Sequence, residues 1–200
     1  MTSGGLGTVR PKIYQPDGWS VRVWGLRPTV GDMEATILVQ ELGHTLEFSY
    51  TDMLCYAGPY SPAGVAVALK VMHRAFAALS PNQPPQRRSV VIRTALVESG
   101  ARDGFESVTR AVTDGRYIVD PALMRPDRGK LLQSFVFQVS MRGRAATLLL
   151  RPGFITAEFI DMADLPERNQ AEESAFDQVK AQVAQRVLAA SAEDVCELFG

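Results

Sequence analysis

The feature that most constrains this fold is a nearly uniform apolar segment, which predicts one long buried helix. Its main stripe repeats at spacings of 4, 3, 4 and 3 residues and consists of Val65, Leu69, Met72, Phe76 and Leu79. Such spacings keep side chains within about 80° of one another on a helix. Val67 and Val71 lie on the opposite side, which leaves a narrow polar sector with Lys70, His73 and Arg74. A helix this apolar is buried, so we expect the rest of the chain to enclose it.

The segments around this helix carry strand and helix patterns in turn. Alternating or β-branched stretches predict strands over residues 20–26, 35–42, 45–48, 89–97, 134–140 and 144–151. Further helices are predicted from Ser49 or Thr51 to Tyr56, after Glu98 with Phe105, Val108 and Val112 on one face, over 169–190, and from Ser191. Arg142-Gly143 predicts a hairpin turn, and residues 114–133 read as irregular. This order predicts an α+β fold with a mixed β-sheet and packed helices.

The length of 200 residues predicts one main domain with an appendage. Folding buries roughly 70% of the surface of an unfolded chain of this size, so a core forms without disulfides or metal. We expect a loosely held arm over residues 1–18, an α+β domain over 19–155 and a C-terminal helical extension over 156–200. The second boundary is set because the alternating strand patterns stop near Pro152 and a helical pattern follows them.

Charge and cysteine usage argue against several classes of protein. The net charge is −1, so no overall positive field would recruit nucleic acid or an anionic membrane. The longest uninterrupted apolar run, over residues 63–69, is far shorter than a membrane span. Residues 1–18 lack the apolar region of a signal peptide, and Cys55 and Cys196 are too few for a disulfide framework. We therefore expect a cytoplasmic protein that binds neither nucleic acid nor membrane.

Side chains with catalytic or metal-binding chemistry are few and scattered. A zinc site needs about four N, S or O ligands, usually with two close in sequence, whereas His44, His73 and the two cysteines are far apart. We expect no metal and no cofactor, with one alternative in which His44, His73 and carboxylates meet in space. A Ser-His-Asp triad lacks the G-x-S-x-G context, and the glycine-rich segment 4–7 does not join a strand to a helix.

The loop that leads into the apolar helix is the strongest candidate for a binding site. Gly58 and Gly64 flank a proline-containing loop with Tyr60 and Ser61 between them. The first N–H groups of a helix have no intrahelical acceptor and lie at the positive end of its dipole, so they bind an anion or a carbonyl oxygen. Glu98, at the next strand-to-helix turn, is expected to face them. The alternative is a tight turn whose glycines serve backbone geometry only.

Three segments, spread over residues 45–151, are similar to sequence motifs of one known protein family. YTDMLCYAGPYSPAGVAVALK is similar to H-G-H-x-C-P-G followed by a small-residue helix, with Gly58 and Pro62 in matching places. ESGARDGFESVTRA is similar to E-T-x-x-C-x-x-D-A-I-Q-x-L-T-G, and DRGKLLQSFVFQVS is similar to D-Y-G-K-x-x-x-x-F. In this order the three resemble the motifs of the FmdE family of formylmethanofuran dehydrogenase proteins.

The resemblance implies a mixed sheet with packed helices, of the type shared with the catalytic domain of glyceraldehyde-3-phosphate dehydrogenase, and it implies a homodimer. It also implies a site at the mouth between two helix N-termini. The positions of the family's metal ligands hold Ala57, Pro59, Ser61 and about Gly100 here, and none of these binds zinc through its side chain. The chain therefore resembles a divergent member of the family without the metal.

We expect a binding or accessory protein for a small anionic or formyl-bearing molecule, with a link to one-carbon metabolism by analogy with the family. The expected ligand-binding residues are Gly58, Tyr60, Ser61, Gly64 and Lys130. An alternative is an enzyme in which Glu98 or His44 is the general base and Tyr60 or Lys130 polarises the substrate. A second alternative is a metal-binding protein that uses His44 and His73.

Overall fold

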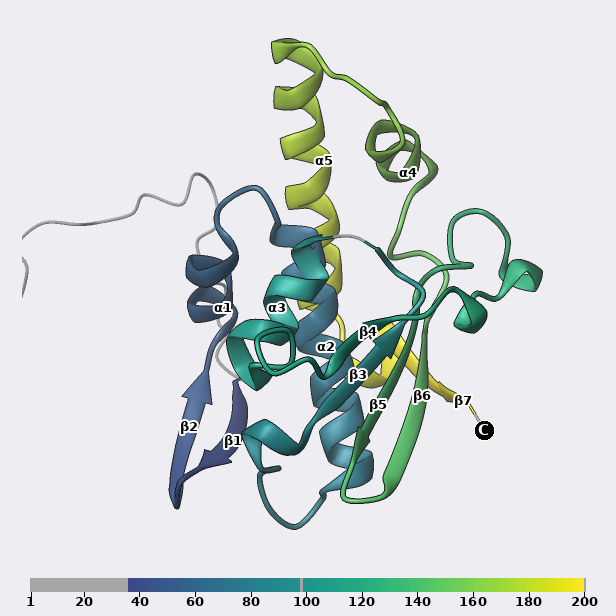
Figure 1. Cartoon of the computed structure of the whole chain (residues 1–200). Helices are drawn as coiled ribbons and strands as arrows, with labels where there is room; N and C mark the ends of the chain where they lie inside the picture. Colours follow the sequence, from purple (N-terminus) through teal and green to yellow (C-terminus); the bar gives the residue numbers. More distant parts are fainter. Residues whose placement is uncertain (1–35, 98, 200) are drawn as a thin grey trace, which may run out of the picture.

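The fold is that of a computed structural model, which describes residues 36–97 and 99–199 (Figure 1). The predicted arm over 1–18 and the predicted strand over 20–26 lie outside these residues, and so does Glu98. The described part contains helices and a mixed β-sheet, which confirms the predicted α+β character.

The helices and strands follow the predicted order closely. The helices are α1 (Tyr50–Ala57), α2 (Pro62–Leu79), α3 (Ser99–Thr109), α4 (Ala157–Ala163), α5 (Gln170–Ala189) and α6 (Ala192–Val195). The strands are β1 (Ile37–Glu41), β2 (His44–Phe48), β3 (Val91–Thr94), β4 (Tyr117–Val119), β5 (Val136–Met141), β6 (Arg144–Leu150) and β7 (Cys196–Phe199). Short 3-10 turns cover Arg87–Ser89, Pro121–Leu123 and Pro126–Arg128.

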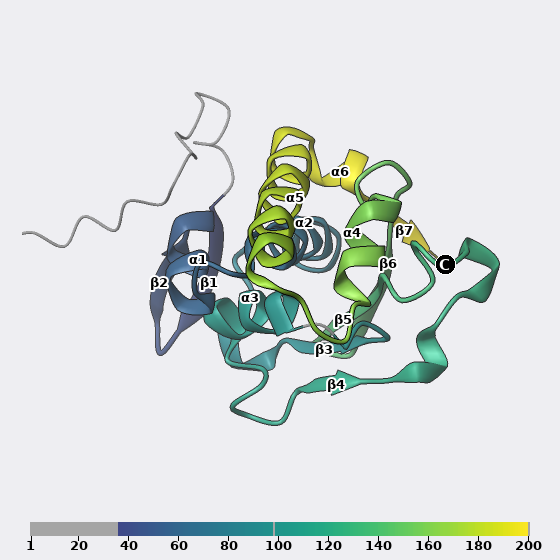
Figure 2. The ribbon, with the colours of Figure 1, turned by 90° about the horizontal axis from the view of Figure 1, so that it is seen from above.

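The strands form two separate sheets. β1 and β2 make a small antiparallel hairpin. The larger sheet has the order β4-β3-β5-β6-β7, in which only the β3–β4 pair is parallel. Ile92, Val139 and Leu148 lie on the sheet face that belongs to the buried core. Helix α2 occupies the centre of the molecule, with α5 on one side, and α2 and α3 lie side by side next to the larger sheet (Figure 2).

Helix α2 is the core helix that the apolar pattern predicts. By length and composition it is the one helix among the described residues that could cross a membrane, but 72% of it is buried inside the protein. The polar sector of this helix is narrower than the sequence predicts, because Lys70 is buried. The Lys70 ammonium donates a hydrogen bond of 3.1 Å to the carbonyl oxygen of Leu188 in α5. The cation therefore connects two helices instead of facing water.

Three local predictions are wrong. Val112 lies beyond α3, because Arg110 adopts a left-handed φ of 57° just after the last helical residue. The segment 114–133, predicted as irregular, contains β4, whose three residues are too short to show a strand period. The C-terminal segment does not end in a helix, because β7 follows α6 and pairs with β6. The last residues therefore complete the sheet.

Candidate functional site: a pocket at the ends of two helices

The first residues of α2 and α3 lie in direct contact. A β-carbon on Gly64 would lie 2.5 Å from the backbone nitrogen of Ala101, and one on Gly100 would lie 2.9 Å from the β-carbon of Ser61. Any side chain at these glycines would force the two helices apart. The structure thus confirms that the two glycine-containing segments meet, and it shows that close helix packing is one reason for these glycines.

A pocket of about 220 Å³ opens beside this helix junction. Its walls come from α2, α3, α4, α5 and the loops before β5 and α4. The lining residues are Tyr60, Ser61, Ala63, Gly64, Val67, Leu96, Gly100, Phe135, Ile155, Phe159, Ala163, Arg168, Phe176 and Lys180. In Figure 1, α4 and the N-terminal half of α5 rise above the sheet, and Figure 2 shows them on either side of α2. The site therefore combines the chain's middle with its C-terminal part.

The first turn of α2 contributes two residues to the pocket lining and has backbone N–H groups without an acceptor in the helix. Ser61 is the N-cap residue, its side chain makes no capping hydrogen bond, and Pro62 occupies the first turn. The first intrahelical bond runs from the Val65 N–H to the Ser61 carbonyl oxygen at 3.1 Å. The N–H groups of Ala63 and Gly64 precede it and have no acceptor within the helix. A ligand oxygen in the pocket can accept from such groups.

Two cations lie on the wall formed by α5 and the segment before it. The Lys180 ammonium lies 4.7 Å and the Arg168 guanidinium carbon 4.8 Å from the centre of the Phe176 ring. Each also has a carboxylate partner: Lys180 pairs with Asp177 at 2.6 Å and Arg168 with Glu173 at 2.9 Å. The side chain of Lys180 is only 12% exposed. These contacts hold both cations in place on the pocket wall.

The rest of the wall is apolar and rich in aromatic rings. Phe159 of α4 contacts Phe176 of α5 with ring centres 5.6 Å apart, while Phe135 lines the pocket from the strand side. Tyr60 is 72% exposed, and the centre of its ring lies 6.0 Å from the Lys180 ammonium. The pocket thus offers an apolar chamber with a positively charged wall.

Three of the residues that we expect to bind a ligand line the pocket, namely Tyr60, Ser61 and Gly64. Gly58 does not, because it ends α1 with a φ of 84° and there serves the turn. Lys130 does not either: it is exposed and pairs with Asp164 at 2.9 Å and Asp161 at 3.4 Å. Both hydrogen bonds raise the pKa of Lys130, and the bond to Asp164 has the larger effect.

The predicted catalytic and metal-binding residues are not brought together at the pocket. His44 is exposed at the tip of the β1–β2 hairpin and is not part of the pocket lining, and Glu98 is not described. Among residues 36–97 and 99–199, no group of three or more His, Cys, Asp or Glu side chains could hold a metal ion. The alternative metal site built on His44 and His73 therefore has no ligand cluster in the described structure.

Sequence reasoning missed the part of the pocket that the C-terminal segment supplies. Phe159, Arg168, Phe176 and Lys180 all come from the segment that we assigned to a C-terminal extension. One local signal was present, because Phe176 and Lys180 are four residues apart and share a face of the predicted helix. Nothing local, however, indicated which surface that face would meet.

The described lining can bind a ligand but contains no obvious general base. It includes no His, Cys, Asp or Glu side chain among the described residues, so its polar groups are hydroxyls, backbone N–H groups and cations. These groups donate hydrogen bonds to an oxygen and attract negative charge. No protein-family model matches the chain, and no curated protein matches it either.

Proposed function

We propose that this chain binds a small molecule with an anionic group in the pocket between α2, α4 and α5. One observation carries the proposal: two cations and a helix N-terminus face a pocket whose described lining contains no acidic side chain. Arginine and lysine attract carboxylate and phosphate groups, and the partial positive charge of the helix end adds to this attraction. The sequence analysis allowed either an anionic or a formyl-bearing ligand, and the positive wall favours the anionic one.

A divergent, metal-free relationship to the FmdE family is part of the same proposal. It is supported by the contact between Ser61, Gly64 and Gly100, because the two motif helices then begin side by side. Homodimerisation, a cytoplasmic location and a link to one-carbon metabolism follow only from this resemblance. Of the residues in the enzyme alternative, Tyr60 lines the pocket, His44 and Lys130 do not, and Glu98 lies outside the described residues.

Isothermal titration with a panel of small carboxylates and phosphates tests this function. Lys180→Met keeps the aliphatic stem but removes the charge, and we expect it to weaken anion binding by at least about tenfold, the loss of one charged hydrogen bond. Arg142→Met is the matched control, because Arg142 is exposed in the turn between β5 and β6 and is not part of this pocket's lining. Equal affinities in the two variants would contradict the proposed function.

A second pair of variants tests the location. Ala163 lines the pocket from α4, whereas Ala157 is exposed at the start of the same helix and does not line it. Ala163→Trp is expected to fill the pocket and abolish binding, while Ala157→Trp leaves the affinity unchanged. If both variants bind anions as the parent protein does, the ligand lies elsewhere.

A further inference from the structure

The proposed function leaves open which anion the pocket takes, and its charges and walls narrow the choice. We infer that the ligand is a monocarboxylate with a compact apolar body, such as an aryl or branched aliphatic acid, rather than a phosphate. This inference rests on the proposed function, because it names the class of ligand for the same pocket.

The charge around the pocket favours a single negative charge on the ligand. Lys180 pairs with Asp177 and Arg168 with Glu173, so these two carboxylates offset part of the positive charge on the pocket wall. The partial positive charge at the N-terminus of α2 adds to what remains. A carboxylate carries one negative charge. A phosphate monoester carries about −1.5 to −2 at neutral pH, and the two nearby carboxylates would repel its additional charge.

The lining combines a few hydrogen-bond donors with a larger set of apolar side chains. Ser61, Gly64 and Lys180 supply donors, whereas Phe135, Ile155 and Phe159 have no hydrogen-bonding side chains. A ligand that is polar throughout would leave some of its groups unpaired against these apolar side chains. A ligand with one charged end and an apolar body satisfies both sets of residues.

The size of the pocket limits that apolar body. About 220 Å³ lies below the usual range for drug-sized ligands, which begins at roughly 300 Å³. A single ring or a short branched chain is therefore the expected size. The aromatic side chains of Phe135, Phe159 and Phe176 in the lining offer apolar contacts to such a body.

Four matched probes test the inference by isothermal titration at neutral pH and constant ionic strength: phenylacetate, phenylacetamide, phenyl phosphate and acetate. We expect phenylacetate to bind at least about tenfold more tightly than each of the others, a difference that one charged or apolar contact supplies. Phe176→Leu is expected to weaken phenylacetate but not acetate. Phe154→Leu, at a position outside the lining, is the control, and unfolding midpoints of all variants verify that they fold.

The outcomes separate the ligand class from the proposed function. Phenyl phosphate binding as tightly as phenylacetate would overturn the monocarboxylate class and leave anion binding in place. Acetate matching phenylacetate would overturn the apolar body alone. Phenylacetamide matching phenylacetate would overturn anion recognition itself, and an absence of binding by all four probes would overturn both.

Discussion

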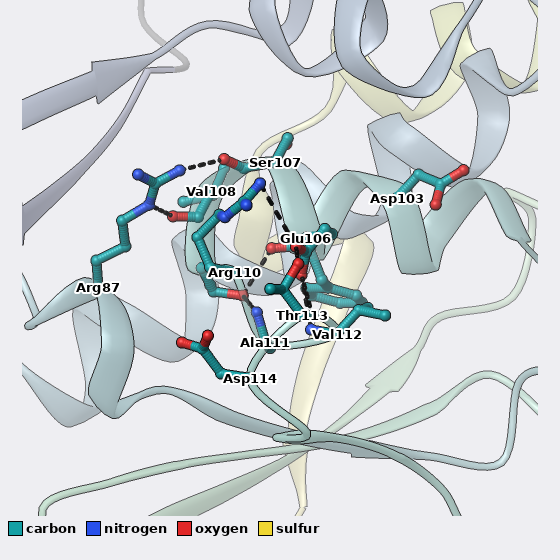
Figure 3. A network of polar contacts seen from close by, with 12 residues as sticks. Arg87, Asp103, Glu106, Ser107, Val108, Arg110, Ala111, Val112, Thr113 and Asp114 are labelled. Atoms are coloured by element: carbon teal, nitrogen blue, oxygen red, sulfur yellow. Dashed lines mark hydrogen bonds and ion pairs between the residues drawn. The ribbon is translucent and has the colours of Figure 1, made fainter.

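Glu106 shows how a buried charge can serve the fold rather than a site. It is 3% exposed, and its carboxylate accepts hydrogen bonds from the N–H of Val112 at 2.6 Å, from the N–H of Thr113 at 3.2 Å and from the Thr113 hydroxyl (Figure 3). It therefore holds the turn that follows α3. Arg87 complements it by donating to the carbonyl oxygens of Ser107 and Val108.

Glu106→Gln is expected to lower the free energy of unfolding by about 1–3 kcal/mol, because the amide replaces an acceptor by a donor and leaves a buried N–H unpaired. Urea unfolding followed by circular dichroism measures this. The control is Glu193→Gln: Glu193 is 59% exposed and pairs with Arg74, so we expect a change of at most about 1 kcal/mol. Equal effects of the two substitutions would refute this account of Glu106.

At the scale of elements, the contact between α2 and α3 depends on the missing side chain of Gly64. Alanine in a helix is ordinarily more stable than glycine by about 1 kcal/mol. Here the added methyl group would lie 2.5 Å from Ala101 N and 2.6 Å from the carbonyl carbon of Gly100. Backbone atoms cannot rotate away as a side chain can, so the helices must separate.

We expect Gly64→Ala to lower the free energy of unfolding by about 1–3 kcal/mol, the usual cost of overpacking, and to abolish ligand binding. Ala77→Gly in the same helix is the control, since Ala77 is exposed and helix propensity alone predicts a loss of about 1 kcal/mol. Chemical denaturation of both variants gives the comparison. A stabilised Gly64→Ala protein would show that the two helix ends do not touch.

At the scale of the whole molecule, the reactivity of Cys196 tests whether β7 is paired with β6 as the structure shows. Cys196 begins β7 and is fully buried, and burial raises the pKa of its thiol to about 12, whereas Cys55 is exposed. The thiolate is the reactive form. We expect a thiol reagent to modify one cysteine rapidly in the native protein and both in denaturant. Rapid modification of both in the native protein would mean that β7 is not docked.

The whole molecule is also expected to lose stability in acid. Hydrogen bonds from Arg87, then Arg88, lower the pKa of Glu41, and a hydrogen bond from Arg116 is the main cause that lowers the pKa of Asp114. A carboxyl whose pKa is lower in the folded state stabilises the fold above its unfolded pKa of about 4, and this stability is lost as the pH falls through the folded pKa.

Urea midpoints measured against pH should therefore stay level with respect to these groups near neutrality and fall below about pH 4. Glu41→Gln should be less stable at neutral pH, because it loses its ion pairs with Arg87 and Arg88, and its midpoint should depend less on pH in acid. A variant with the same acid dependence as the parent protein would rule out Glu41 as a source of the effect.

Local signals predicted most elements, because the interactions that define them lie within a few residues. Ser49 caps α1 in a reciprocal capping box with Asp52, as its side chain suggested. Arg142 and Gly143 both adopt the positive φ of the predicted hairpin turn. The strands β4 and β7 were missed, since three or four residues carry no readable period and their pairing partners are distant in the sequence.

By itself, the amino-acid sequence predicted that residues 65–79 belong to a buried helix and that the glycine-containing starts of two helices belong to the candidate site. Periodicity and backbone freedom are properties of the local chain, so they can be read without a structure. Only the tertiary structure decided that Arg168, Phe176 and Lys180 complete the pocket and that His44 and Lys130 do not line it. The reason is physical: an amphipathic helix shows which face is buried but not which surface covers it.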